Sequence, residues 1–132
     1  MSTRVTSTFE IKTWDEEPYD EREGAKLTRA HLIKTFQGDV EGESTTDLLF
    51  AYGTEEGSAA YVGLERFVGR VQGRSGIFVL RHSAAMKRGE GEAAWSVVPD
   101  SGTGELLGLS GEAQITVEPD GSHSFTLDYD LG

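Results

Sequence analysis

The sequence predicts an all-β protein built as a closed, eight-stranded antiparallel β-barrel. Three observations support this fold class. Apolar and polar residues alternate with period two through most of the 132 residues. Eight such segments are separated by turns that contain Gly, in two cases next to Asp. The first and last segments are both amphipathic, so they can pair and remove the two exposed edges of the sheet. A β-sandwich is the alternative.

The two terminal segments show the alternation most clearly. In "RVTSTFEIKTW" one face carries Val5, Ser7, Phe9 and Ile11. In "SHSFTLDYDL" one face carries His123, Phe125, Leu127, Tyr129 and Leu131. Strands of this kind have one buried and one solvated face.

Six further strands are predicted between them, at 27–37, 40–52, 58–68, 76–85, 91–98 and 111–118. Because most connections are short, strands that are neighbours in the sequence are expected to pair in the sheet. Two segments interrupt the pattern. Residues 14–24, "WDEEPYDEREG", are acidic and predict a solvated loop. Residues 99–111 are glycine-rich and predict a short helical turn at Glu-Leu-Leu. Neither is long enough for a second domain, so 1–132 is predicted to be a single domain.

Charge and composition exclude several classes of function. The net charge of −11 argues against binding to nucleic acid or to anionic membrane surfaces. No apolar run approaches the ~20 residues that span a bilayer. Since there is no Cys, disulfides, thiolate metal sites and a cysteine nucleophile are excluded. The N-terminus lacks the apolar core of a secretory signal, and a cytoplasmic protein is expected.

The hairpin "YVGLERFVGRVQGRSGIFVLRHSA", residues 61–84, carries the candidate chemistry. If Gly73-Arg74 forms a two-residue type II′ turn, Glu65 and His82 are direct cross-strand partners on one face. A carboxylate beside an imidazole can act as an acid–base pair. The alternative is a structural hydrogen bond near the barrel rim. A register shift of one residue would turn both side chains outward or separate them.

Other polar and aromatic residues are predicted to face the barrel interior. Lys34 lies in an apolar row and needs a carboxylate partner if it is buried; otherwise it extends to solvent at a strand end. Tyrosine hydroxyls can contact a ligand or satisfy backbone groups. The predicted ligand-binding residues are Lys34, Tyr52, Tyr61, Glu65, Phe78, His82 and Trp95, of which Glu65 and His82 are the catalytic candidates.

No metal site and no cofactor are predicted. The three histidines, His31, His82 and His123, lie on separate strands without ligand spacing. The sequence lacks a phosphate-binding loop and a nucleophile elbow, and the acidic segment 15–23 lacks the calcium-loop pattern.

Several local patterns together resemble a known family. "TFEIKTWDEEPYDE", "KTFQGDVEGEST", "YVGLERFVGRVQGRSGIFVLRH", "WSVVPDSGTGELLGLSGEA" and "FTLDYDL" resemble the bacterial domain of unknown function 3224 (DUF3224) over essentially the whole chain. Asp100 and Ile77 depart from its pattern, which has small residues there. The resemblance implies a barrel similar to that of allene oxide cyclase. Allene oxide cyclases and the related dirigent proteins hold a reactive lipophilic molecule in the barrel, but DUF3224 itself has no assigned activity.

Three functions follow as hypotheses. The first is binding of an apolar small molecule in the barrel. The second is a cofactor-independent isomerase or cyclase that uses Glu65, His82 or Lys34. The third is a non-catalytic structural or assembly protein. Because the opposite face of the hairpin is also apolar, a homo-oligomer is expected; this face carries Val62, Leu64, Val68, Ile77 and Val79.

Overall fold

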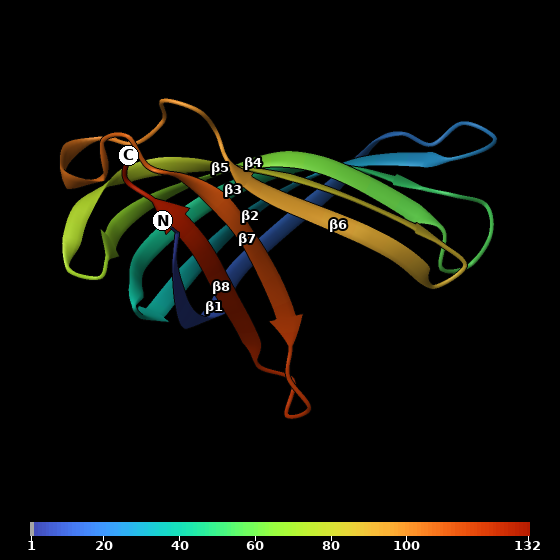
Figure 1. Cartoon of the computed structure of the whole chain (residues 1–132). Helices are drawn as coiled ribbons and strands as arrows, with labels where there is room; N and C mark the ends of the chain where they lie inside the picture. The colour runs from blue at the N-terminus through green and yellow to red at the C-terminus, as the bar shows by residue number, and fades with distance from the viewer. Residues whose placement is uncertain (1) are drawn as a thin grey trace.

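The computed structural model describes residues 2–132, and its eight strands close into an antiparallel barrel (Figure 1). The strands are β1 (Thr3–Asp20), β2 (Lys26–Gly38), β3 (Val40–Tyr52), β4 (Ala59–Val71), β5 (Arg74–Lys87), β6 (Glu90–Val97), β7 (Ser110–Val117) and β8 (His123–Asp130). Each strand pairs with the next, and β8 pairs back with β1. The predicted closed barrel is confirmed, and the sandwich alternative is wrong.

The first strand is longer than predicted. The sequence predicts a loop over 14–24, but β1 continues to Asp20 and stays paired with β2. The alternation was hidden because the register shifts between Ile11 and Thr13. After this bulge Trp14 and Glu16 take the inward positions, opposite the inward Leu32 and Ala30.

The predicted short helical turn is present as η1 (Gly104–Leu106). In residues 2–132, no helix is long and apolar enough to cross a bilayer.

The β4–β5 register differs from the prediction by two residues. Val71 pairs with Arg74, so the turn is Gln72-Gly73 and not Gly73-Arg74. Both turn residues have positive φ, 49° and 81°, which is the type I′ and not the type II′ geometry. Glu65 therefore pairs with Leu80, and the expected direct pair with His82 is wrong. Since side chains alternate with period two, a two-residue shift leaves both side chains on the inner face.

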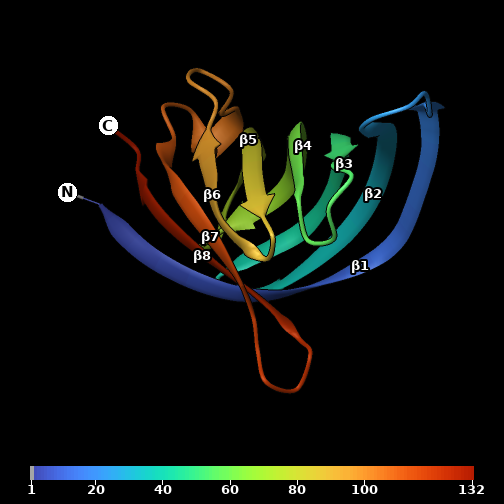
Figure 2. The same ribbon diagram turned by 90° about the vertical axis from the view of Figure 1, so that its right-hand side faces the viewer.

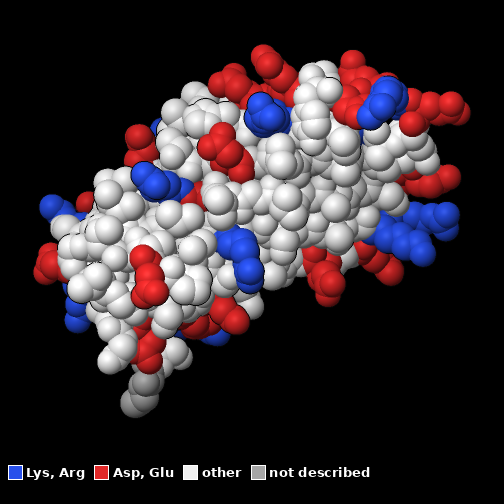
Figure 3. All heavy atoms as spheres, turned by 90° about the horizontal axis from the view of Figure 1, so that it is seen from above, with Lys and Arg blue, Asp and Glu red and all other residues white. Residues whose placement is uncertain are grey.

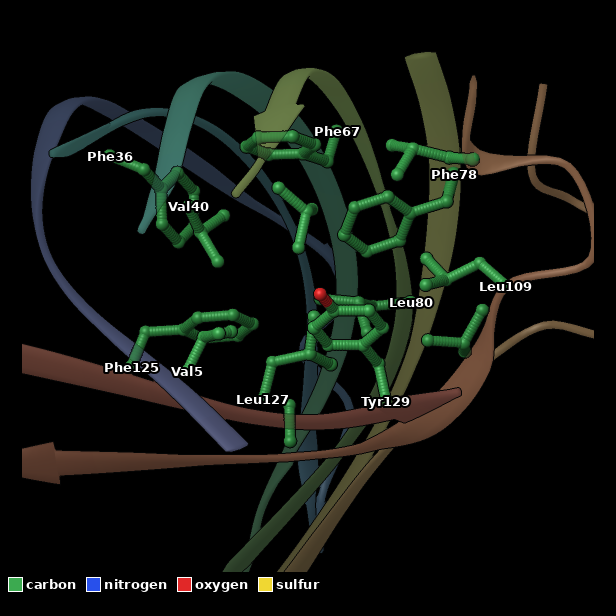
Figure 4. Close-up of a cluster of buried hydrophobic side chains, with 14 of the residues drawn as sticks. Val5, Phe36, Val40, Phe67, Phe78, Leu80, Leu109, Phe125, Leu127 and Tyr129 are labelled. Atoms are coloured by element: carbon green, nitrogen blue, oxygen red, sulfur yellow. The ribbon is translucent and has the colours of Figure 1, made fainter. Parts of the chain in front are cut away.

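One half of the barrel is filled by side chains. Phe36, Phe67, Phe78 and Phe125 pack edge to face or tilted, with ring centroids 5.0–5.5 Å apart (Figure 4). Paired glycines in β3 and β4 make room for them, since a Cβ on Gly69 would lie 2.9 Å from Cζ of Phe67. This half is a packed core and not an open channel.

The other half opens out. β8 pairs only with Thr3–Phe9 of β1, and β6 meets β7 through only two residue pairs. Beyond these joints β1 to β6 continue as one curved sheet, and the β7–β8 hairpin projects away from it (Figure 2). The inner side of this extended sheet is called the concave face below.

Candidate ligand-binding site

A buried carboxylate lies where the packed half of the barrel meets the concave face. Glu65 of β4 is 1% exposed. Its Oε1 lies 3.2 Å from Nζ of Lys34 on β2 and 2.7 Å from Nε2 of His82 on β5. Its Oε2 accepts a hydrogen bond of 2.5 Å from Oγ of Ser44 on β3. Four neighbouring strands thus supply one side chain each to a buried polar cluster, called the Glu65 cluster below.

The charges of this cluster follow from burial and from its contacts. Burial alone would raise the pKa of Glu65, but His82, Lys34 and Ser44 outweigh it and lower that pKa to about 2. Burial, together with the charge of Lys34, lowers the pKa of His82 although the Glu65 carboxylate acts to raise it. At neutral pH the cluster therefore holds an ionised Glu65 and a neutral imidazole, with Lys34 as the compensating cation.

Several polar atoms at this level have no hydrogen-bond partner among residues 2–132. Nε2 of His82 approaches Glu65 closely, but the geometry is not that of an aligned hydrogen bond. Oγ1 of Thr46 and Nε1 of Trp95 are buried and also unpartnered. Thr46 pairs with Glu65 across β3 and β4, and Trp95 pairs with His82 across β5 and β6. Unpartnered buried donors are costly, so those around the Glu65 cluster call for an explanation.

Aromatic side chains cover the concave face next to this cluster. Phe50 contacts Trp14, Tyr52 and Tyr61, with ring centroids 5.2–6.0 Å apart. On the same face, toward β6, Trp95 meets His82 edge to face, with ring centroids 5.7 Å apart. Trp14 is 47% exposed and the others are half-buried, so this aromatic surface is open to solvent.

Tyr61 links the aromatic surface to the polar cluster. It lies four residues before Glu65 on β4, on the same inward face. Burial, and then the charge of Glu65, raise the pKa of its phenol. The Tyr61 hydroxyl therefore stays protonated at neutral pH, and it lies close enough to Glu65 for the carboxylate charge to affect its pKa.

A second carboxylate lies at the outer end of the concave face. Glu16 accepts hydrogen bonds from Trp14 Nε1 at 2.9 Å, Thr28 Oγ1 at 2.6 Å and Tyr52 Oη at 2.7 Å. Burial and then Glu16 raise the pKa of Tyr52 to about 12. These contacts fix the Trp14 and Tyr52 rings in place.

The predicted site residues separate into three groups. Lys34, Glu65 and His82 come together in the Glu65 cluster, and the carboxylate expected for Lys34 is Glu65. Tyr52, Tyr61 and Trp95 lie on the concave face, and Phe78 lies fully buried in the packed half.

Three polar residues of the site were missed by sequence reasoning. Ser44 and Thr46 lie in the same inward row of β3 as Val40 and Leu48, but the residues between them are polar too, so the alternation does not mark which face is buried. Glu16 fell in the segment assigned to a loop. Within the described range, 2–132, no cluster of three or more His, Asp or Glu side chains is arranged to hold a metal ion.

Comparisons with known proteins agree with the fold. A family model described as "Protein of unknown function (DUF3224)" matches residues 5–129. The crystal structure of a DUF3224 protein of unknown function from Shewanella oneidensis MR-1 is similar over 100% of this chain and 99% of its own. The two are 35% identical, with a TM-score of 0.87. No curated protein matches the chain. The likeness to allene oxide cyclase stays a prediction.

Proposed function

Because the chain belongs to the DUF3224 family, described as proteins of unknown function, its chemistry must be argued from the site, and we propose that it binds an apolar small molecule on the concave face. The observation that carries this proposal is the position of the unpartnered donors. Thr46 and Trp95 lie beside the Glu65 cluster, next to a solvent-accessible aromatic surface.

The lining specifies the chemical class of the ligand. Phe50, Tyr61 and Trp95 offer flat apolar rings, which favour a planar or polyunsaturated body. The indole N–H of Trp95 donates, and the hydroxyl of Thr46 donates or accepts. A carbonyl, ether or phenolic oxygen on an otherwise apolar molecule satisfies both groups. Since Lys34 already neutralises Glu65, the site does not require a charged ligand.

The binding test uses N-phenyl-1-naphthylamine, an apolar fluorescent probe, with the full chain. Both tryptophans, Trp14 and Trp95, lie on the concave face, so bound probe quenches their emission by energy transfer. The Tyr61→Ala variant should weaken probe binding by roughly 10-fold, the effect of one aromatic contact. Native mass spectrometry of gently purified protein tests in parallel for a retained molecule.

The matched control lies on the opposite side of the sheet. Val62, next to Tyr61 on β4, points outward and is 54% exposed. Val62→Thr should leave probe binding unchanged. If this variant loses the probe while Tyr61→Ala keeps it, binding is on the outer face and the proposal is wrong. If the wild-type chain neither binds the probe nor retains a molecule, the non-catalytic structural hypothesis takes its place.

A second candidate function is proton transfer within a bound ligand, favoured by the 2.7 Å contact between His82 and Glu65. A neutral imidazole beside an ionised carboxylate can take a proton from a ligand carbon next to a carbonyl and return it to another carbon. The test recovers a carbonyl-containing retained molecule after incubation in D₂O and measures deuterium by mass spectrometry. Label that appears with the wild type but not with His82→Ala supports catalysis; equal label in both, or none in either, contradicts it.

A further inference from the structure

The outer face of β3, β4 and β5 carries apolar side chains that the barrel does not use. Leu49, Val62, Leu64 and Val68 are 43–55% exposed, although the inner faces of the same strands already supply the core. Ile77 and Val79 of β5 extend the same surface and are half-buried. This surface is called the outer apolar face. Contiguous exposed apolar patches on soluble proteins mark interaction sites.

A shallow hollow lies at the centre of this face. It has a volume of about 610 Å³ and its apolar walls include Leu49, Val62 and Leu64. Arg29 and Arg81 stand at its two sides. The outer apolar face is therefore recessed at its centre, so a protruding apolar side chain fits into it.

The charge of this face differs from that of the molecule. The chain has a net charge of −11, yet on this face the outward charges nearly balance. Four arginines stand beside three acidic residues: Arg29, Arg66, Arg70 and Arg81 with Glu41, Glu43 and Asp47. Seen from above, a broad uncharged area with a few basic side chains crosses the molecule, while acidic side chains lie mostly around its edges (Figure 3). Two copies of so acidic a chain repel each other least through the face on which charge of both signs balances.

The charges are also arranged for self-recognition. Asp47, Leu64 and Arg81 lie side by side in one row across β3, β4 and β5, with Leu64 in the middle. A two-fold axis along β4 through Leu64 would bring Asp47 of each copy to Arg81 of the other. Across residues 2–132, Arg81 has no ion pair or hydrogen-bond partner through its side chain, whereas Asp47 meets His31 Nδ1 at 2.8 Å. Arg81 is thus a free cation beside an exposed leucine.

We propose that the outer apolar face binds a second copy of this chain, forming a two-fold symmetric dimer centred on Leu64. The dimer buries the four exposed aliphatic side chains and pairs Arg81 with Asp47 across the interface. The concave face lies on the other side of the sheet and stays open in this dimer, so the dimer does not depend on the proposed ligand site.

The experiment measures the mass of the full chain in solution by sedimentation equilibrium. The wild type should give twice the chain mass of 14.3 kDa. Leu64→Asp should weaken dimerisation by roughly 30-fold or more, as expected for a central interface residue. Arg81→Asp should weaken it by about 10-fold, and adding Asp47→Arg to that variant should restore it, because the pair is then reversed in both copies.

The controls are apolar residues elsewhere on the surface that are even more exposed. Leu107→Asp and Val117→Asp, at positions 73% and 65% exposed, should stay dimeric. Circular dichroism verifies that each variant is folded. A monomeric wild type at about 100 µM, well above the Kd of a typical interface, overturns the proposal. A Leu64→Asp variant that stays dimeric, or a charge reversal that fails to restore the Arg81→Asp variant, also overturns it.

Discussion

Nε2 of His82 lies 2.7 Å from Oε1 of Glu65, although the two residues are diagonal neighbours and not partners in the β4–β5 ladder. The directly opposite residue on β4 is Gly63, which has no side chain, so the imidazole extends past it to the carboxylate. Lys34 and Ser44 approach the same carboxylate from β2 and β3. The Glu65 cluster therefore ties four strands together inside the barrel.

Replacement of Glu65 should destabilise the fold strongly. Glu65→Gln leaves the ammonium of Lys34 buried without a counter-charge, which costs about 3–5 kcal/mol. Urea unfolding followed by circular dichroism measures the loss. The double variant Glu65→Gln with Lys34→Met should recover part of it, because no buried charge then remains. The exposed Glu43→Gln should change stability by less than about 0.5 kcal/mol. A double variant no more stable than Glu65→Gln would contradict the pairing.

Acid should destabilise the protein as Glu65 becomes protonated. The folded-state pKa of Glu65 is about 2, below its ordinary value of 4.5. A depressed carboxyl pKa contributes stability above pH 4.5 that is lost as pH falls toward 2, here roughly 3 kcal/mol. Urea unfolding at a series of pH values measures this loss. A stability that is flat between pH 4.5 and 2 would contradict it.

His82 should add a pH dependence at higher pH. Because burial lowers the pKa of His82, the unfolded chain binds a proton below its ordinary value of 6.5 while the folded chain does not. Stability should therefore fall as pH decreases from 6.5 toward the folded-state pKa. The His82→Gln variant should lack this slope, whereas replacing the exposed His31 with Gln should keep it. Two-dimensional NMR of the histidine rings follows the titration directly.

Tyr52 should ionise about two pH units above a free tyrosine. Its pKa of about 12 reflects burial and the hydrogen bond to Glu16. Ultraviolet titration of the four tyrosines should show a transition near pH 12 that is absent in Tyr52→Phe. Glu16→Gln should move it only part of the way back, since burial remains. An unchanged curve for Tyr52→Phe would exclude the assignment.

The position of the Gln72-Gly73 turn can be tested by replacing Gly73 with Ala, which adds one methyl group. Gly73 has a φ of 81°, and no atom beyond its immediate chain neighbours lies within 4 Å of the position its Cβ would take. Gly73→Ala should therefore cost about 1 kcal/mol from backbone strain alone. The neighbouring Arg74, which opens β5, should tolerate Ala within about 0.5 kcal/mol. Thermal unfolding compares the two, and an equal cost at both positions would place the turn elsewhere.

Much of the fold could be predicted because the alternation of inward and outward side chains along a strand does not depend on the exact strand boundaries. The strand boundaries moved and the β4–β5 register shifted by two residues, yet Glu65 and His82 stayed on the inner face. The turn was misplaced because Gln72 adopts a positive φ, which the sequence gives no reason to expect of a glutamine. The loop predicted over 14–24 failed because a bulge after Ile11 reverses the alternation of β1.

The site could be predicted only where a charged residue stands in an otherwise apolar row of a strand. Lys34 in an apolar row signalled a buried partner, and Glu65 supplies it. Ser44 and Thr46 gave weaker signals, because small polar residues occur on either face of a strand. The division into a packed and an open half depends on how far β6 and β7 stay paired, which no local pattern records.

β6 and β7 pair through only two residue pairs, so the barrel is closed there by fewer backbone contacts than between any other two neighbouring strands. Local opening concentrates where the fewest interstrand hydrogen bonds must break, so amide hydrogen exchange near Trp95 and Ser96 should be faster than in β3 or β4. Breaking this joint leaves the chain as a single sheet running from β7 through β8 and β1 to β6, with every other ladder intact. β6 and β7 can thus separate while the other strand pairs stay intact, and Trp95 lies at the point of separation.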